Sequence, residues 1–376
     1  MLSLFKNATV LNKDFEFITA DVKTENGIIT QIAPEIAGEG VDLSGKYILP
    51  GAVDIHTHGA VGHDHCSGDK EGLARVCEWE AKNGVTSFLP TTMTVGEDTI
   101  INAVKAVRDY MKEEHTGATP LGVHLEGPFF SMAKKGAQPA EYIKNPDFDM
   151  FKRIFDASEG AVKIIDVAPE LEGAVEFISK AKEYCTVSLG HTSGSYEDAM
   201  KAYAAGATNT VHLYNGMTGA THREPGIAGA AWDCESATAE LICDGIHIHP
   251  AIIRTTFKIL GKRVVMISDS LSCAGLPDGT VFKDAGGHEI TVSGGKATLA
   301  DGTIAGSSTN LFECVRRNVK AGIPLERAMY AASYAPAKAI GEDKNVGSID
   351  IGKRADLVIT DTDLNIEAVY VKGVRV

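Results

Sequence analysis

The feature that most constrains the fold is a repeated alternation of strand-like and helix-like segments between residues 48 and 267. Short apolar runs, which are typical of buried strands, alternate with amphipathic segments at helical spacing. Eight such β–α units predict a closed parallel (β/α)8 barrel of the TIM type. An open doubly wound sheet would need a glycine-rich phosphate loop after the first strand, and the sequence has none there. The strand-like runs are Ile48–Ile55, Val85–Thr91, Leu121–Leu125, Val162–Val167, Thr186–Leu189, Thr208–Leu213, Ala239–Cys243 and Val264–Ile267.

Both ends of the chain differ from this middle region. Residues 1–49 and the last thirty residues consist of short alternating apolar and polar stretches separated by turn residues, which indicate small antiparallel strands. We therefore predict an α/β protein in which residues 1–49 and 346–376 form a small β-sandwich domain beside a catalytic barrel domain of residues 50–345. A glycine-rich stretch at Ala285–Gly306 predicts a β-hairpin excursion before the last barrel helix.

Composition and charge argue against several classes of partner. The chain has 376 residues and a net charge of −14, with acidic residues scattered and no basic block. Nucleic acid and anionic membranes are therefore not expected as partners, and an anionic substrate would need a local cationic pocket. Seven cysteines without paired spacing fit reduced thiols. The N-terminus shows no signal-peptide pattern, and no uncharged apolar run reaches membrane-spanning length, so we expect a cytoplasmic protein.

Side chains with catalytic or ligand chemistry follow the strand-like runs at the point where each run ends. Barrel enzymes place their catalytic groups at these carboxyl ends, and six of the eight runs end in histidine or a carboxylate. His56 and His58 stand two residues apart, on the same side of a strand, with Asp54 two residues before His56. Each residue alone has an ordinary explanation as a turn residue or a helix cap, whereas the whole set predicts a metal hydrolase. The set comprises His56, His58, His124, Glu126, His191, His212, His247, His249 and Asp269.

Imidazole and carboxylate groups that meet at one barrel mouth suit a divalent metal ion. An ion held by three or four of them, with one position open, lowers the pKa of its water to about 7. A nearby carboxylate can then carry the proton, and Asp269 is the candidate for this general base. Such ligands suit zinc, iron, cobalt and nickel alike. We expect zinc or iron, with one or two ions per chain.

With these residues in view, the chain resembles the amidohydrolase superfamily and, within it, the N-acetylglucosamine-6-phosphate deacetylases. The matching segments occur in the family's order along almost the whole chain. The segments that begin at His124 and His212 are more specific than the superfamily motifs near either end. The segments are Pro50–Gly59, His124–Phe129, Leu189–Thr192, His212–Met217, Arg223–Gly226, Asp244–His247, Ser268–Ser270 and Gly347–Leu357.

The resemblance implies hydrolysis of the acetamide of N-acetylglucosamine 6-phosphate to glucosamine 6-phosphate and acetate, a step of amino-sugar metabolism. It implies that Glu126, His191 and His212 hold one metal ion. Some members of the family lack the first histidine pair and use one metal. Because this chain has both His56 and His58, a second ion with Glu126 bridging is expected.

The resemblance also implies roles around the substrate. Asp269 would act as general base and then as general acid to the departing amine, and His247 would polarise or orient the acetamide carbonyl. In the family an arginine is contributed across a dimer interface, so Arg223 would serve the neighbouring site of a homodimer or homotetramer. The residues implied to contact the sugar phosphate are Ala137, Asn215, the Gly216 amide, Arg223 and His247.

Two other functions remain open from the sequence: an amidohydrolase for another N-acyl amino sugar or an unphosphorylated substrate, and a non-catalytic barrel scaffold. Hydantoinase-like and dihydroorotase-like relatives are disfavoured because they need a lysine at the end of strand four, where Val167-Ala-Pro-Glu stands. Gln138 occupies a position where other members of the family have histidine. The role of Gln138 is open, and so are those of His63 and His65, which we interpret as plain loop residues.

Overall fold

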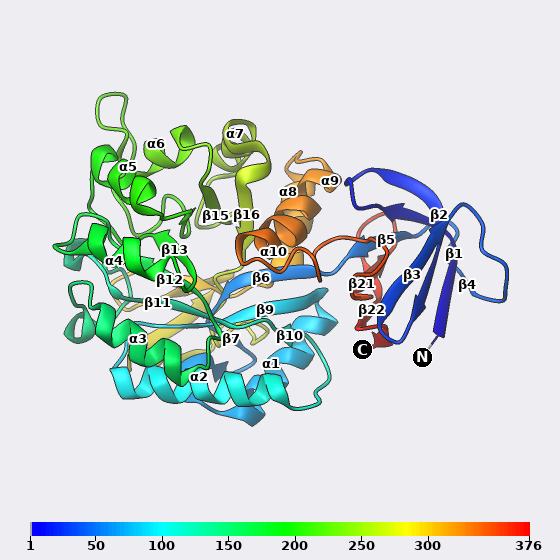
Figure 1. The fold of residues 1–376 in the computed structure, drawn as a ribbon, viewed down its shortest axis with the longest axis horizontal. Helices are drawn as coiled ribbons and strands as arrows, with labels where there is room; N and C mark the ends of the chain where they lie inside the picture. The colour runs from blue at the N-terminus through cyan, green and yellow to red at the C-terminus, as the bar shows by residue number, and fades with distance from the viewer. Residues whose placement is uncertain (1) are drawn as a thin grey trace.

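The larger part of the protein is a closed barrel of parallel strands, seen in this computed structural model of residues 2–376 (Figure 1). Each barrel strand pairs in parallel with the next along the chain. The barrel closes where His58 N donates to Ser270 O at 2.7 Å and Asp269 N donates to His56 O at 2.9 Å. The predicted (β/α)8 barrel is therefore confirmed. Its strands are β6 (Ala52–Thr57), β9 (Val85–Thr92), β11 (Val123–Phe129), β12 (Val162–Val167), β13 (Thr186–Leu189), β14 (Asn209–Thr210), β15 (Thr238–Ile242) and β16 (Val264–Ile267), and the short β10 (Thr119–Pro120) also pairs with β9.

Helices cover the outside of the barrel, and several begin at caps that the sequence provides. Ser195 and Asp198 form a capping box at the start of α5, and the Asn310 side chain accepts from Glu313 N at the start of α8. Such caps satisfy N–H groups that the first helical turn leaves without partners. The helices are α1 (Lys70–Lys82), α2 (Glu97–Lys112), α3 (Phe148–Ala157), α4 (Ala174–Ala181), α5 (Tyr196–Ala205), α6 (Gly226–Asp233), α7 (Pro250–Leu260), α8 (Leu311–Lys320), α9 (Leu325–Met329) and α10 (Ala335–Ala339), with short 3-10 segments at His65–Ser67, Met132–Lys134, Ala140–Tyr142 and Gly261–Arg263 and a π-helical turn at Tyr330–Tyr334.

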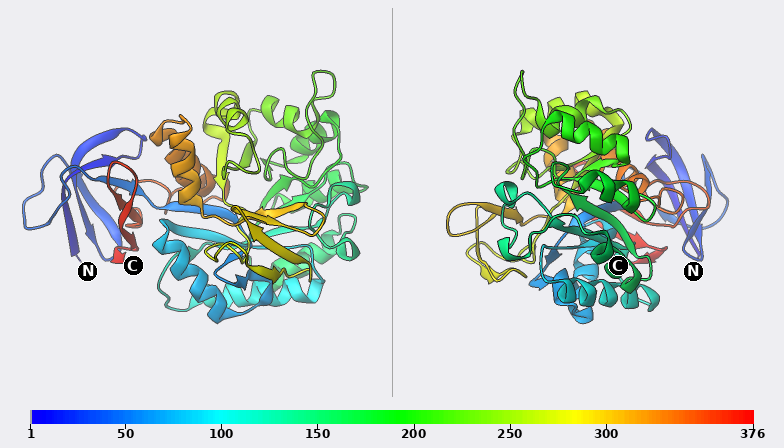
Figure 2. Two further views of the ribbon diagram at one scale, coloured as in Figure 1. Left: turned by 180° about the vertical axis from the view of Figure 1, so that it is seen from behind. Right: turned by 60° about the vertical axis from the view of Figure 1, so that its left-hand side comes forward.

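The two ends of the chain form a second, smaller β unit, which Figure 2 shows beside the barrel. Its strand order, β23-β22-β21-β5-β1-β2-β3, places C-terminal strands next to N-terminal ones, and β4 pairs with β1. Phe5, Val22, Ile48 and Leu357 contribute to its own buried core, as expected for the predicted small β-sandwich. We propose residues 1–49 and 346–376 as its extent. The strands are β1 (Leu2–Leu11), β2 (Phe17–Glu25), β3 (Ile28–Ala33), β4 (Val41–Asp42), β5 (Tyr47–Pro50), β21 (Leu357–Thr360), β22 (Ile366–Val371) and β23 (Val374–Arg375).

The first predicted barrel strand, Ile48–Ile55, is in fact two strands that belong to different sheets. β5 pairs antiparallel with β21 in the terminal sheet, whereas β6 pairs in parallel with β9 in the barrel. The break falls at Gly51, where a Cβ atom would lie 2.0 Å from Thr86 Oγ1. Only glycine allows this close approach, and an apolar run gives no sign of a change of sheet. The prediction of a single strand here was therefore wrong.

The hairpin excursion predicted at Ala285–Gly306 is confirmed as a four-stranded antiparallel sheet between β16 and α8. Ile290, Val292 and Ala297 pack with Leu271 in a small core of its own. The strands are β17 (Val281–Lys283), β18 (Glu289–Ser293), β19 (Lys296–Thr298) and β20 (Ile304–Ser307), and a separate two-stranded ribbon, β7 (Gly59–Ala60) with β8 (His63–Asp64), follows β6.

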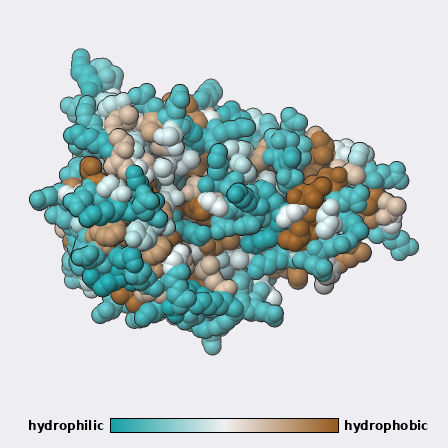
Figure 3. All heavy atoms as spheres, in the orientation of Figure 1, coloured by the Kyte–Doolittle hydropathy of each residue, from teal (hydrophilic) through white to brown (hydrophobic). Residues whose placement is uncertain are grey.

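The surface is mostly hydrophilic on the face shown in Figure 3, with hydrophobic residues gathered mainly over the terminal sheet. Within residues 2–376, no helix combines the length and the apolar composition needed to cross a bilayer.

Candidate active site

Glu126, in the middle of β11, lies at the centre of the candidate site. Its Oε1 atom is 3.0 Å from His191 Nε2 and 3.1 Å from His212 Nε2, and these two nitrogens are 3.1 Å apart. All three side chains are buried. Three donors that converge so closely can hold one divalent ion.

The first histidine pair reaches the same carboxylate from the other side of the barrel mouth. His56 Nε2 and His58 Nε2 are 3.3 Å apart, and they lie 3.7 Å from Glu126 Oε1 and 3.3 Å from Glu126 Oε2, respectively. Asp269 Oδ1 is 3.5 Å from the first of these nitrogens and 3.4 Å from the second. Glu126 therefore connects two histidine pairs, which is the arrangement that two ions bridged by one carboxylate would need.

The other ring nitrogens of these histidines test whether the donor set fits a metal. His191 Nδ1 is 2.9 Å from Lys134 O and His212 Nδ1 is 3.2 Å from Asn215 O. Because a carbonyl oxygen can only accept, Nδ1 carries the hydrogen and Nε2 presents its lone pair to the centre. Metal-binding histidines in proteins are usually held in this way. His56 Nδ1 is held instead by Glu240 at 3.0 Å, and no partner within residues 2–376 faces His58 Nδ1.

Three of the candidate residues adopt a left-handed backbone just after their strands end. The φ angles are 46° at His191, 26° at His212 and 49° at Asp269. This region is unfavourable for residues other than glycine, and each such residue costs on the order of 1–3 kcal/mol. The surrounding fold therefore has to impose these conformations, and they turn the three side chains into the mouth.

The electrostatics of the site favour ionised carboxylates. Burial alone would raise the pKa of the Glu126 carboxyl, but hydrogen bonds with His191, His212 and His58 hold that pKa well below its usual range. Burial also opposes ionisation of Asp269, whose pKa is nevertheless lowered by His58 and His56. Burial disfavours the charged form of His212, yet Glu126 raises its pKa to about 9. A divalent cation can replace such histidine protons as the balancing charge.

A cavity of about 200 Å³ opens above these residues. His247 lines it with its Nδ1 atom held 2.7 Å from Asp244 Oδ2, so that its Nε2 atom remains available. Asp244 is itself fixed because its other oxygen accepts from the backbone N–H groups of Ile246 and His247. Four of the predicted substrate residues line this cavity: Ala137, Asn215, Gly216 and His247. The fifth, Arg223, is exposed in a loop and is not part of the lining.

Other predicted strand-end residues do not join the centre. His124 is held at both nitrogens, by Ile55 O and by Asp166 Oδ2, each at 2.9 Å. His249 caps α7 by accepting from Ala251 N. Asp54 belongs to none of the candidate metal-binding groups within residues 2–376, and its Oδ1 atom accepts from the backbone N–H groups of His56 and Ser268.

Sequence reasoning missed several residues of the site or left their role open. The Gln138 amide donates to Glu126 Oε2, and its oxygen accepts from Thr94 N at 2.8 Å, so this side chain clamps the central carboxylate. Thr303–Gly306 of the hairpin excursion form one wall of the cavity. His65 is buried with its ring near that of Phe88, so it is more than a plain loop residue. Gln138 could have been sought in the loop after the segment His124–Phe129. The sequence of the excursion, in contrast, does not indicate that Thr303–Gly306 pack against the cavity.

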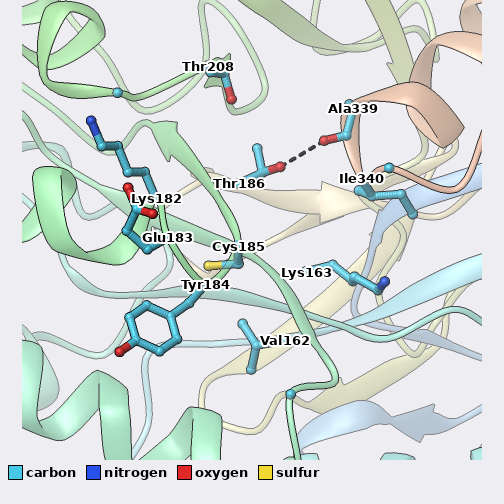
Figure 4. A pocket seen from close by; sticks show the side chains of 13 residues that line it. Val162, Lys163, Lys182, Glu183, Tyr184, Cys185, Thr186, Thr208, Ala339 and Ile340 are labelled. Atoms are coloured by element: carbon cyan, nitrogen blue, oxygen red, sulfur yellow. Dashed lines mark hydrogen bonds between the residues drawn. The ribbon is translucent and has the colours of Figure 1, made fainter.

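A second cavity, of about 410 Å³, lies at the opposite end of the barrel (Figure 4). It is bordered by the first residues of β12 and β13, by residues that directly follow α4 and α5, and by the last residue of α10. Thr186 Oγ1 donates to Ala339 O at 2.7 Å across it. Burial raises the pKa of the Cys185 thiol, so the thiol stays protonated and unreactive. Its lining within residues 2–376 includes none of the predicted ligands, and the first cavity is therefore the candidate active site.

Comparison with known proteins agrees with this geometry. The family model described as "Amidohydrolase family" matches residues 47–376. The chain belongs to the amidohydrolase family. It is 34% identical over 354 residues to the N-acetylgalactosamine-6-phosphate deacetylase of Escherichia coli O157:H7, covering 94% of this chain and 93% of the relative. It is 36% identical over 340 residues to the N-acetylglucosamine-6-phosphate deacetylase of Bacillus subtilis (strain 168), covering 87% and 83%.

Among solved structures, the amidohydrolase fold of this chain is similar to that of a mutant N-acetyl-D-glucosamine-6-phosphate deacetylase from Mycobacterium smegmatis, solved in complex with N-acetyl-D-glucosamine-6-phosphate. The TM-score is 0.94 at 30% identity, with 100% of this chain and 99% of that chain covered. The match includes both the barrel and the terminal sheet. Membership of the amidohydrolase family, whose members are typically metal-dependent, accords with the histidine and carboxylate clusters at the barrel mouth.

Proposed function

We propose that this chain is a metal-dependent deacetylase that hydrolyses N-acetylglucosamine 6-phosphate to glucosamine 6-phosphate and acetate in amino-sugar metabolism. The observation that carries the proposal is the position of Glu126 between two histidine pairs. Asp269 faces one of these pairs, and the cavity above carries His247 and Asn215. The names of the similar proteins describe deacetylases of the same substrate, which supports the same reaction class.

Glu126, His191 and His212 would hold one divalent ion, and His56 and His58 would hold a second that shares Glu126. When bound, such an ion lowers the pKa of water to about 7 and stabilises charge on a carbonyl oxygen. Zinc and iron both suit these ligands. Because Nδ1 of His191 and of His212 donates to a backbone carbonyl, the Nε2 lone pair of each ring is directed at the centre.

The protein's own groups would move the proton and orient the substrate. The lowered pKa of Asp269 makes it a carboxylate that can take the proton of the attacking water as the oxygen bonds to the acetyl carbon. The same proton then passes to the sugar nitrogen as the C–N bond breaks, which yields the amine and acetate. His247, fixed by Asp244, would donate from Nε2 to orient the acetamide.

The phosphate would be held in the cavity by Asn215 and the Gly216 amide, with Ala137 also in the lining. A protein of net charge −14 needs local positive charge for such a substrate. Arg223 lies on an exposed loop outside the cavity of its own chain. We therefore propose a homodimer or homotetramer in which the partner subunit's Arg223 completes the site. The free cysteines support a cytoplasmic location.

N-acetylgalactosamine 6-phosphate is a second candidate substrate. One similar protein is named as the deacetylase of that compound. The two sugars differ only in configuration at carbon 4, so both share the acetamide and the phosphate that the named residues would contact. The proposal of N-acetylglucosamine 6-phosphate is therefore tested directly against this epimer.

The test is acetate release from four compounds on one preparation of known metal content: both amino-sugar 6-phosphates and both sugars without phosphate. We expect fast release from the phosphorylated sugars, with N-acetylglucosamine 6-phosphate preferred, and one or two ions per chain. A preference for the galactose epimer would reassign the substrate. Equal release from unphosphorylated sugars would contradict the phosphate pocket, and no release at all with metal bound would contradict the deacetylase proposal.

A further inference from the structure

A buried carboxylate beneath the candidate metal centre has no role in the proposed function so far. Glu240, on β15, is fully buried. Its Oε2 atom is 3.0 Å from His56 Nδ1, and its Oε1 atom accepts from Asn209 Nδ2 at 2.7 Å. The cost of burying this charge is therefore offset by two hydrogen bonds.

The orientation of Glu240 is fixed by neighbouring strands. Asn209, on β14, also donates to Ser188 Oγ at 3.0 Å, and its own oxygen accepts from Thr238 Oγ1 at 2.8 Å. The direction of the Asn209 amide is thus determined, with its NH2 group towards Glu240. The result is a chain of held polar groups that runs from β13 and β14 through β15 to His56 on β6.

The four candidate histidines differ in what holds Nδ1. His191 and His212 are held by neutral backbone carbonyls, whereas His56 is held by a carboxylate. A carboxylate partner makes an imidazole a stronger metal ligand than a carbonyl does. His58 has no Nδ1 partner within residues 2–376, so the His56–His58 pair depends on Glu240 for its orientation and ligand strength.

We propose that Glu240 is a positioning residue that determines whether the His56–His58 pair binds a metal ion. This inference rests on the two-ion arrangement of the proposed function. In this role, Glu240 does not contact the substrate. Its action is to keep hydrogen on His56 Nδ1 and to present His56 Nε2 to the ion shared with Glu126.

His56, His124 and Glu240 also lie close enough to form a metal site by themselves, but their hydrogen bonds argue against it. Both His124 nitrogens are occupied, by Ile55 O and by Asp166. Glu240 and Asp166 therefore make a natural comparison. Each is a buried carboxylate paired with a buried histidine at the same level of the barrel, where the His56 and His124 rings lie 4.6 Å apart, but only His56 faces the candidate centre.

The test compares Glu240→Gln with Asp166→Asn, two near-isosteric changes, and measures zinc bound per chain across a series of chelator-buffered free zinc concentrations. For Glu240→Gln we expect roughly 10- to 100-fold weaker binding of one ion, with the other ion unchanged. For Asp166→Asn we expect both affinities of the wild type. Unchanged zinc binding in Glu240→Gln would overturn the proposal, as would equal weakening in both variants or a wild-type chain that binds a single ion.

A second variant guards against loss of folding in Glu240→Gln. Asn209→Leu removes one hydrogen bond to Glu240 and keeps the charge, so we expect a smaller weakening of the same ion. Unchanged zinc binding in a folded Asn209→Leu protein would count against the proposal. Acetate release is measured separately. Wild-type chain that binds two zinc ions but releases no acetate would contradict the deacetylase function and leave the role of Glu240 standing.

Discussion

The two ends of the barrel both carry a cavity, and the smaller one has the side chains for catalysis. At the carboxyl ends of the strands, a cavity of about 200 Å³ lies over Glu126, Asp269 and the histidine pairs. At the opposite end, a cavity of about 410 Å³ is crossed by a hydrogen bond from Thr186 to Ala339. The comparison shows that the site is identified by ligand atoms that converge on one point and are oriented by hydrogen bonds. The volume of a cavity does not identify it.

Two lysines, Lys163 and Lys182, line the cavity at the opposite end, and Lys182 has a structural explanation. Barrel helices run against the strands, so the carbonyl ends of α4, α5 and α10 gather there. Lys182 lies against Gly206 at the end of α5, where a Cβ atom would be 2.3 Å from Lys182 Cδ. Cations at helix C-termini are favourable by about 0.3–1 kcal/mol. The positive charge of Lys182 therefore stabilises the fold without indicating a ligand.

The largest effect is expected for Asp269→Asn at the barrel mouth. Loss of the proton carrier should lower the turnover of N-acetylglucosamine 6-phosphate by roughly 10²- to 10⁴-fold, while metal content stays near normal. Acetate release and metal analysis on the same preparation provide the measurement. Substantial activity in this variant would remove Asp269 from its proposed role.

Next in size is Arg223→Ala, which tests whether the mouth is completed by a second chain. Loss of a charged hydrogen bond of about 1.5–3 kcal/mol should reduce kcat/KM for the phosphorylated sugar by roughly 10- to 100-fold. The KM for the unphosphorylated sugar should not change. An equal effect on both sugars would rule out a phosphate contact.

Mixing provides the control for Arg223. A hybrid of one Asp269→Asn chain with one Arg223→Ala chain has an intact site if the arginine acts across the interface, so activity should reappear on mixing. If Arg223 acts within its own chain, no site in the hybrid is intact and activity stays low.

A smaller effect concerns stability near the mouth. Burial lowers the pKa of His65 to about 3 from its ordinary value of 6.5. Because the unfolded chain binds the proton more readily, this stability contribution is full above pH 6.5 and is lost as pH falls towards 3. Between pH 7 and 5.5, His65→Phe should therefore lose about 1 kcal/mol less stability than the wild type. Denaturant unfolding at both pH values measures this, and parallel losses would contradict it.

The smallest effect is expected at the opposite end of the barrel. Thr186→Val removes the hydrogen bond to Ala339, which should cost about 1 kcal/mol of stability and leave acetate release unchanged. Thermal unfolding and the acetate assay measure the two quantities. A clear loss of acetate release would show that a change in this cavity affects the active site at the other end of the barrel. The two ends would then not be independent.

The rule that barrel enzymes carry their chemistry at strand ends predicted most of the residues that the structure brings together. His56, His58, His191 and His212 lie at or just after the ends of strands, and Glu126 follows the predicted run Leu121–Leu125, although β11 itself continues to Phe129. Their positions along the chain were therefore enough to find them. Glu240 could not be found this way, because it stands within the apolar run Thr238–Ile242 and its partner lies on another strand. The left-handed backbone at Asp269 likewise depends on contacts made by the folded barrel.

The change of sheet at Gly51 also bears on how the chain is completed during synthesis. β5 obtains its neighbour β21 only when residues 357–360 have been made. β6, which contains His56 and is followed by His58, continues from β5 through Gly51. N-terminal segments usually fold first on the ribosome. Here, however, one of the two strands that pair with the segment before His56 comes from near the end of the chain, while the other is the N-terminal β1. The first histidine pair therefore gains its final support only when translation is nearly finished.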